Sequence, residues 1–150
     1  MASKKVVCMA LVGAFLWLSN MTRSEIAHVT SQLARFVSNP GTKHFNAAMR
    51  VLVYLDGSIS RHLRYAPDSS LPLHALVDSS WDTKFSCSGI YFFFMGCPFH
   101  WFSKMQRSVT LSSAEAKFFG CMLARKGTLW IRQVLLDLNL LKPGPSLVKG

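Results

Sequence analysis

The stretch Gly89-Ile90-Tyr91-Phe92-Phe93-Phe94-Met95-Gly96 decides the fold class, because β-branched and aromatic residues follow one another between two glycines. Residues of these types favour β-strands. Shorter apolar segments at 71–78 and 99–103 lie on either side of it along the chain. Together the three segments predict three consecutive antiparallel strands.

Helical spacing of apolar residues follows these strands, from Ser112 to about Leu141. The region is predicted as one long helix, or as two helices divided at Gly127. Its expected apolar face consists of Phe119, Leu123, Trp130, Val134 and Leu138. Strands followed by a helix predict an α+β fold, and three strands with one covering helix leave a sheet edge that usually needs another strand. The fold is therefore expected to be incomplete.

Helical patterns fill the chain before these strands. Thr22-Arg23-Ser24-Glu25 has the form of a capping box, which predicts a helix start, and apolar residues follow at 26, 29, 33 and 36. A further helix is predicted from Thr42 to Asp56. The sequence thus predicts three packed helices over 1–57, a polar linker over 58–70 and the α+β region over 71–150.

The charge balance points to an anionic partner. The chain has the length of one ordinary domain, 150 residues, with 17 Lys and Arg against 7 Asp and Glu, a formal net charge of +10. Nucleic acid or an acidic membrane attracts such a protein, although an excess spread along the chain is as typical of solvated basic proteins. A hydrophobic share of 50% excludes intrinsic disorder.

The sequence leaves more than one interpretation open for the cysteines and for the N-terminal segment. Cys8, Cys87, Cys97 and Cys121 form no Cys-x-x-Cys pair, which favours buried free thiols over a zinc site or disulfides. Lys4 and Lys5 precede the apolar run 6–18, in the manner of a secretory signal peptide, but this run is too short to span a bilayer as a helix. A small secreted protein with an N-terminal signal therefore stays an alternative.

Several motifs together resemble one family. The segments are Leu33-Ala34-Arg35-Phe36-Val37-Ser38-Asn39-Pro40, Arg50-Val51-Leu52-Val53-Tyr54-Leu55, Trp101-Phe102-Ser103-Lys104-Met105-Gln106 and Val109-Thr110-Leu111-Ser112-Ser113-Ala114-Glu115-Ala116-Lys117-Phe118. In order and spacing they resemble the polyprotein of Ty1/copia-type LTR retrotransposons, where reverse transcriptase passes into its ribonuclease H domain. The resemblance implies a connection segment of reverse transcriptase type over 1–57 and a degenerate, truncated ribonuclease H-like domain over 71–150.

The resemblance also assigns site residues. Ribonuclease H cleaves the RNA strand of an RNA–DNA hybrid with two Mg²⁺ ions, which need several carboxylates close together. Asp78 matches the metal-binding Asp of the first strand, whereas Lys117 stands where the family has the metal-binding Glu of its first helix. Glu115, two residues earlier, would face another side of the helix. The resemblance thus implies a catalytically inactive chain without bound Mg²⁺.

The implied partners are an RNA–DNA hybrid or other nucleic acid and the remainder of the polyprotein, without a membrane. Lys104, Arg107 and Arg125 are the candidate nucleic-acid contacts, since they flank the strand and helix expected to face a hybrid. An intracellular location, cytoplasm or nucleus, follows from the same resemblance. The alternative is an active metal-dependent hybrid ribonuclease that uses Glu115 with Asp78 or recruits a partner chain.

Overall fold

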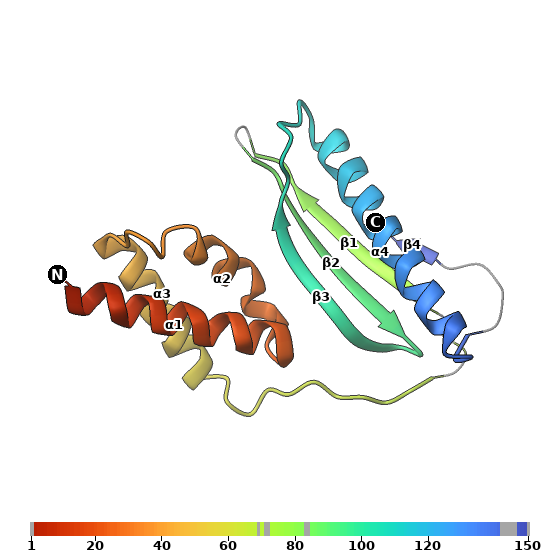
Figure 1. Ribbon diagram of the computed structural model, residues 1–150, viewed down its shortest axis with the longest axis horizontal. Helices are drawn as coiled ribbons and strands as arrows, with labels where there is room; N and C mark the ends of the chain where they lie inside the picture. Colours follow the sequence, from red (N-terminus) through yellow and green to blue (C-terminus); the bar gives the residue numbers. More distant parts are fainter. Residues whose placement is uncertain (1, 69, 71–72, 83–84, 142–146, 150) are drawn as a thin grey trace. The chain divides into compact units, whose positions relative to one another are not determined.

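The structure, a computed structural model, describes residues 2–68, 70, 73–82, 85–141 and 147–149. The length of the chain suggested one ordinary domain, but the chain divides into two compact units, residues 1–63 and 64–150. Helices form the first unit, and a sheet with one helix forms the second (Figure 1). The predicted α+β class, with helices first and then strands followed by a helix, is confirmed.

The first unit packs three α-helices and a short 3₁₀ helix around one core. The elements are α1 (Ala2–Met21), η1 (Ser24–Ile26), α2 (Ala27–Ala34) and α3 (Thr42–Asp56). Each α-helix contributes buried side chains to this core, among them Phe15, Leu33 and Val51. Burial of these apolar surfaces drives the association of the helices and stabilises α2, because an isolated helix of eight residues is marginal in water.

The helix start predicted at Thr22-Arg23-Ser24-Glu25 is confirmed by η1 and α2, but the predicted capping box is not, because the residue before η1 is Arg23. The Nε atom of Arg23 donates to Glu25 Oε1 at 2.8 Å, and Arg23 Nη1 donates to the carbonyl oxygen of Ser58 at 3.0 Å. The residue before η1 makes no side-chain cap hydrogen bond. Glu25 therefore neutralises a buried arginine. The predicted apolar stripe also ends early, because α2 stops at Ala34 and leaves Phe36 exposed.

The second unit contains the three predicted antiparallel strands. They are β1 (His74–Ser80), β2 (Cys87–Phe94) and β3 (Cys97–Met105), and the first two residues of the segment predicted at 71–78 lie outside the described residues. Met95 and Gly96 join β2 to β3 with φ angles of 52° and 75°. Two successive positive φ angles are typical of the type I′ hairpin turn, whose twist matches that of the strands.

A fourth strand, which the sequence analysis did not predict, lies at the other edge. β4 (Leu147–Lys149) pairs in parallel with β1, and the strand order is β3-β2-β1-β4. Three residues are too few to show an alternating pattern, so the strand left no signal in the sequence. It covers the edge of β1 at His74, Ala75 and Leu76.

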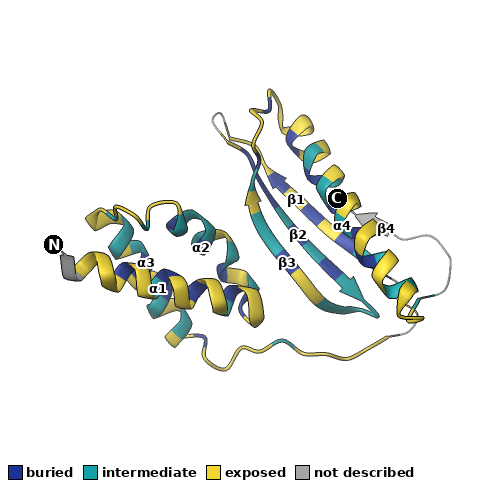
Figure 2. Cartoon of the chain, in the orientation of Figure 1, coloured by how far each residue is buried: buried dark blue, intermediate teal, exposed yellow. Residues whose placement is uncertain are grey.

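A single helix, α4 (Ser113–Asp137), covers one face of the sheet and runs through Gly127 without a break (Figure 1). Its predicted apolar face is correct only in part, because Leu123 packs against the core but Trp130 is 70% exposed and Leu138 is 61% exposed. The buried stripe of the helix consists mainly of small residues (Figure 2), namely Ala116, Gly120, Ala124, Thr128 and Ile131. At Gly120 and Gly127 the helix lies too close to the sheet for a larger side chain.

The four cysteines are free thiols. Cys8 and Cys87 are buried as predicted, whereas Cys97 and Cys121 are partly exposed. Cys121 lies on α4, one turn after Lys117.

Candidate functional site

A cleft of about 390 Å³ lies between β1 and the first turns of α4. Four of its lining side chains are apolar, and the others include one carboxylate and one ammonium group. The residues that line it are Val77, Asp78, Ser79, Ala114, Lys117, Phe118 and Cys121. The cleft therefore combines apolar walls with two opposite charges.

The cleft lies where β4 no longer covers β1. β4 pairs with His74, Ala75 and Leu76, so in the described residues the edge of β1 has no paired strand from Val77 onward. Along β1, exposed residues alternate with buried ones, as in a strand with one face covered by α4. Asp78 belongs to the exposed set.

The structure brings Asp78 and Lys117 to the same cleft. Asp78 Oδ1 accepts a hydrogen bond from the backbone N–H of Ser79 at 2.9 Å. Lys117 and Cys121 are four residues apart on α4, so they lie on one side of the helix and both line the cleft. The two positions that the motifs singled out, on separate elements, thus both line this cleft.

Glu115 lies outside the lining of this cleft. Its Oε2 accepts a hydrogen bond from the backbone N–H of Leu111 at 2.6 Å, and its own N–H donates to Ser112 Oγ at 3.1 Å. Both bonds satisfy backbone and side-chain groups at the start of α4, where a carboxylate also interacts favourably with the helix dipole. The geometry therefore gives Glu115 a capping contact.

A buried polar network lies behind the cleft, and the sequence analysis did not single it out. The Nε2 atom of Gln106 donates to Ser88 Oγ at 2.8 Å and to the carbonyl oxygen of Ala116 at 2.9 Å. Ser88 Oγ in turn lies 2.8 Å from Ser79 Oγ. Gln106, which directly follows β3, therefore links β2 to α4 through these hydrogen bonds. It is 1% exposed, so the link lies inside the unit. Gln106 is the last residue of the Trp101–Gln106 motif, and this position was the feature of the sequence that could have drawn attention to it.

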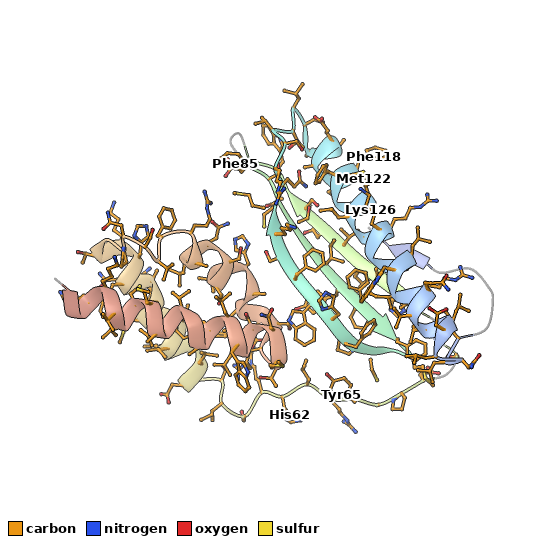
Figure 3. All side chains as sticks on the ribbon, in the orientation of Figure 1. His62, Tyr65, Phe85, Phe118, Met122 and Lys126 are labelled. Carbon is orange, nitrogen blue, oxygen red and sulfur yellow. The ribbon has the colours of Figure 1, made fainter. Side chains whose placement is uncertain are left out.

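The three candidate nucleic-acid contacts lie elsewhere on the surface. Lys104 on β3, Arg107 after β3 and Arg125 on α4 are all exposed, and none lines the cleft. Phe118, Met122 and Lys126 follow one another along α4 (Figure 3). Phe118 is 78% exposed, so this helix offers apolar and basic side chains together.

The carboxylates do not gather into a metal site. Across the part of the chain that the structure describes, no three His, Cys, Asp or Glu side chains lie close enough to hold a metal ion. Among the residues that line the cleft, Asp78 is the one acid, and one carboxylate is too few for a pair of Mg²⁺ ions. The donor set in the cleft does not fit Mg²⁺.

Comparisons with known proteins found transposon polyproteins. The chain is 31% identical over 140 residues to the retrovirus-related Pol polyprotein from transposon TNT 1-94 of Nicotiana tabacum, covering 91% of this chain and 10% of that protein. It is 33% identical over 114 residues to the putative transposon Ty5-1 protein of Saccharomyces cerevisiae, covering 73% of this chain and 37% of that one. The chain thus spans about a tenth of the tobacco polyprotein.

One relative has nearly the same extent as this chain. It is the secreted RxLR effector protein 161 of Plasmopara viticola, 31% identical over 132 residues, which are 85% of this chain and 93% of that protein. No family model matches the chain, and no solved structure does either.

Proposed function

The chain belongs to the family of retrovirus-related transposon Pol polyproteins, and we propose that it is a catalytically inactive remnant of a copia-type member. In this proposal residues 1–57 are the connection segment of a reverse transcriptase, and residues 71–150 are a truncated ribonuclease H-like domain. Three antiparallel strands, a covering helix and a short fourth strand beside the first support the second assignment.

The observation that carries the proposed inactivity is the shortage of carboxylates at the cleft, because Asp78 is the one acidic residue among those that line it and Lys117 lines it from α4. Two-metal hydrolysis requires several carboxylates around the reacting phosphate. The cleft supplies one carboxylate and one ammonium group, and the carboxylate of Glu115 is bound to the backbone N–H of Leu111. No step of metal-assisted cleavage can be assigned to these residues.

The remaining activity in this proposal is weak binding of nucleic acid, with an RNA–DNA hybrid as the expected ligand. Exposed basic side chains, including Lys104, Arg107 and Arg125, would contact the phosphate backbone. Such binding weakens steeply as salt concentration rises, because each phosphate contact releases condensed counterions. The rest of a polyprotein and an intracellular location, in the cytoplasm or nucleus, belong to the same proposal.

Hybrid cleavage and hybrid binding test the proposal in one preparation. Folded protein is incubated with a labelled RNA–DNA hybrid in Mg²⁺ and separately in Mn²⁺, beside an active ribonuclease H as positive control. We expect no cleavage. We also expect protein to raise the fluorescence anisotropy of the labelled hybrid, and this rise to become smaller as salt is added. Cleavage that disappears in Asp78→Ala would establish the alternative, an active hybrid ribonuclease. Absence of binding at low salt would refute the residual binding.

A second candidate function is that of a small secreted protein. The Plasmopara viticola relative is named a secreted protein, which favours this candidate. The helix at Lys4–Met21 also favours it, because by length and composition it is long and apolar enough to cross a membrane. Against it, Cys8, Val12 and Phe15 of this helix belong to the core of the first unit, so removal of a signal would remove part of that core. Fusion of residues 1–25 to a reporter decides the matter, since export of the reporter would support secretion.

A further inference from the structure

Helix α1 is apolar on two opposite sides. One side is buried in the core of the first unit through Cys8, Val12 and Phe15. Figure 2 shows exposed positions along α1. The large apolar residues among them on the other side are Val6, Met9, Leu16, Trp17 and Met21. At 3.6 residues per turn these positions fall on one side of the helix, in a stripe that also contains Gly13 and the polar Asn20. The solvent-exposed face of a surface helix normally consists of polar residues, so this face of α1 is more apolar than such a face usually is.

The charges near this face have one sign. Residues 2–21 contain no Asp or Glu, and the charged residues among them, Lys4 and Lys5, are both exposed near the start of the helix. Over residues 1–63 there are seven Lys and Arg against two acids. One of these acids, Glu25, is paired with Arg23. An apolar stripe with basic residues at its end is complementary to a surface that is apolar inside and anionic outside.

We propose that the exposed face of α1 docks on the surface of an acidic lipid bilayer. The helix lies in the interface with the stripe of Val6, Met9, Leu16, Trp17 and Met21 inserted among the acyl chains and with Lys4 and Lys5 at the phosphate groups. Trp17 suits this depth, because the amphipathic indole ring favours the membrane–water boundary. This docking adds a membrane surface to the partners, against the expectation of none from the sequence.

The packing of α1 argues against a spanning orientation. A helix that crosses the bilayer would have to withdraw Cys8, Val12 and Phe15 from the core, where all three are at most 2% exposed. Lying flat, the helix keeps that core and inserts only the opposite face. A second copy of the chain is the less suitable occupant, because its first unit carries the same excess of positive charge.

Flotation with lipid vesicles tests this docking in the full chain. Wild-type protein is mixed with vesicles of phosphatidylcholine and phosphatidylserine, or of phosphatidylcholine alone, and we expect it to float with the acidic vesicles and to be released by salt. Trp17→Glu should weaken binding about tenfold or more, because it puts a charge in the apolar stripe. Lys4→Gln with Lys5→Gln should weaken it several-fold and reduce its salt dependence.

Ile59→Glu and Val53→Glu are the matched controls, since Ile59 and Val53 are 82% and 71% exposed but lie outside α1. Both controls should float like the wild type, and circular dichroism should show all variants folded. Equal flotation of Trp17→Glu and wild type, or no flotation of folded wild-type protein, would refute the docking. A dimer in lipid-free solution that Trp17→Glu dissociates would assign the face to a second copy instead. Vesicle binding uses none of the cleft residues, so it can fail or succeed independently of hybrid binding.

Discussion

Gly120 lies where α4 comes closest to the sheet. A methyl group added there would lie 2.2 Å from Ser79 Oγ and 3.1 Å from Val77 Cγ2. Neither neighbour can move freely, because Ser79 is bound to Ser88 and Val77 belongs to the core. The helix and the sheet therefore lie too close together at this position for any residue with a Cβ atom. Glycine is needed there although it destabilises a helix relative to alanine.

Gly120→Ala is expected to destabilise the second unit by about 1–3 kcal/mol through this overpacking, despite the better helix propensity of alanine. Denaturant unfolding monitored by circular dichroism measures the change. Gly13→Ala is the matched control, because an added methyl group there meets nothing within 4 Å. That substitution should stabilise α1 by up to about 1 kcal/mol. Equal effects at the two positions would contradict the close packing of α4.

Lys117→Glu tests the charge that the cleft carries. The substitution places a second carboxylate in the cleft that Asp78 lines, and two carboxylates with open positions can bind a hard divalent cation. We expect calorimetry with Mn²⁺ or Mg²⁺ to detect weak binding in the variant and none in the wild type. Lys126→Glu, an exposed position outside the cleft, should bind no metal. Binding by both variants would indicate a nonspecific charge effect.

The residues of the cleft show what sequence motifs can and cannot predict. Asp78 and Lys117 were named from motif positions, and the fold brings them to one cleft, although their proposed roles stay predictions. The burial of Gln106 was not foreseen, because a glutamine is usually exposed and its partners Ser88 and Ala116 come from other elements. Hydrogen bonds between distant segments leave no local pattern in the sequence.

At the level of elements, the periodicity of α4 was identified but its buried face only in part. The sequence analysis chose large apolar residues such as Trp130, whereas the sheet packs against Ala116, Gly120 and Ala124. Apolar periodicity ranks side chains by hydrophobicity, but a close helix–sheet contact selects small ones. The three antiparallel strands were predicted correctly, because β2 and β3 are rich in aromatic residues and β1 lies in a short apolar segment.

Removal of residues 142–150 tests the contribution of β4. Without it, the backbone groups of β1 from His74 to Leu76 become an unpaired sheet edge. We expect a lower midpoint of thermal unfolding and concentration-dependent association, because unpaired edges pair with other chains. Light scattering and thermal denaturation measure both effects. An unchanged midpoint in a truncated chain that stays monomeric would show that β4 adds nothing to the sheet.

At the scale of the whole molecule, each unit has a hydrophobic core of its own. The first core draws on α1, α2 and α3, including Phe15 and Leu33, and the second on the sheet and α4, including Ile90 and Ile131. Between them, residues 59–68 form no helix or strand. Two small cores explain why a length typical of one domain gives two units.

Limited digestion with trypsin tests this division. Arg61 and Arg64 are exposed and lie in the segment without helix or strand, whereas Arg125 and Lys126 are exposed but held in α4. Proteases cleave backbone that can adopt an extended conformation, so we expect the first cuts after Arg61 and Arg64. Mass spectrometry of the early products should find two fragments that meet in this segment. First cuts after Arg125 or Lys126 would mean that α4 opens more readily than the connecting segment, and that the second unit is not an independently stable body. In urea, trypsin should no longer cut first after Arg61 and Arg64, because every Lys and Arg is then accessible.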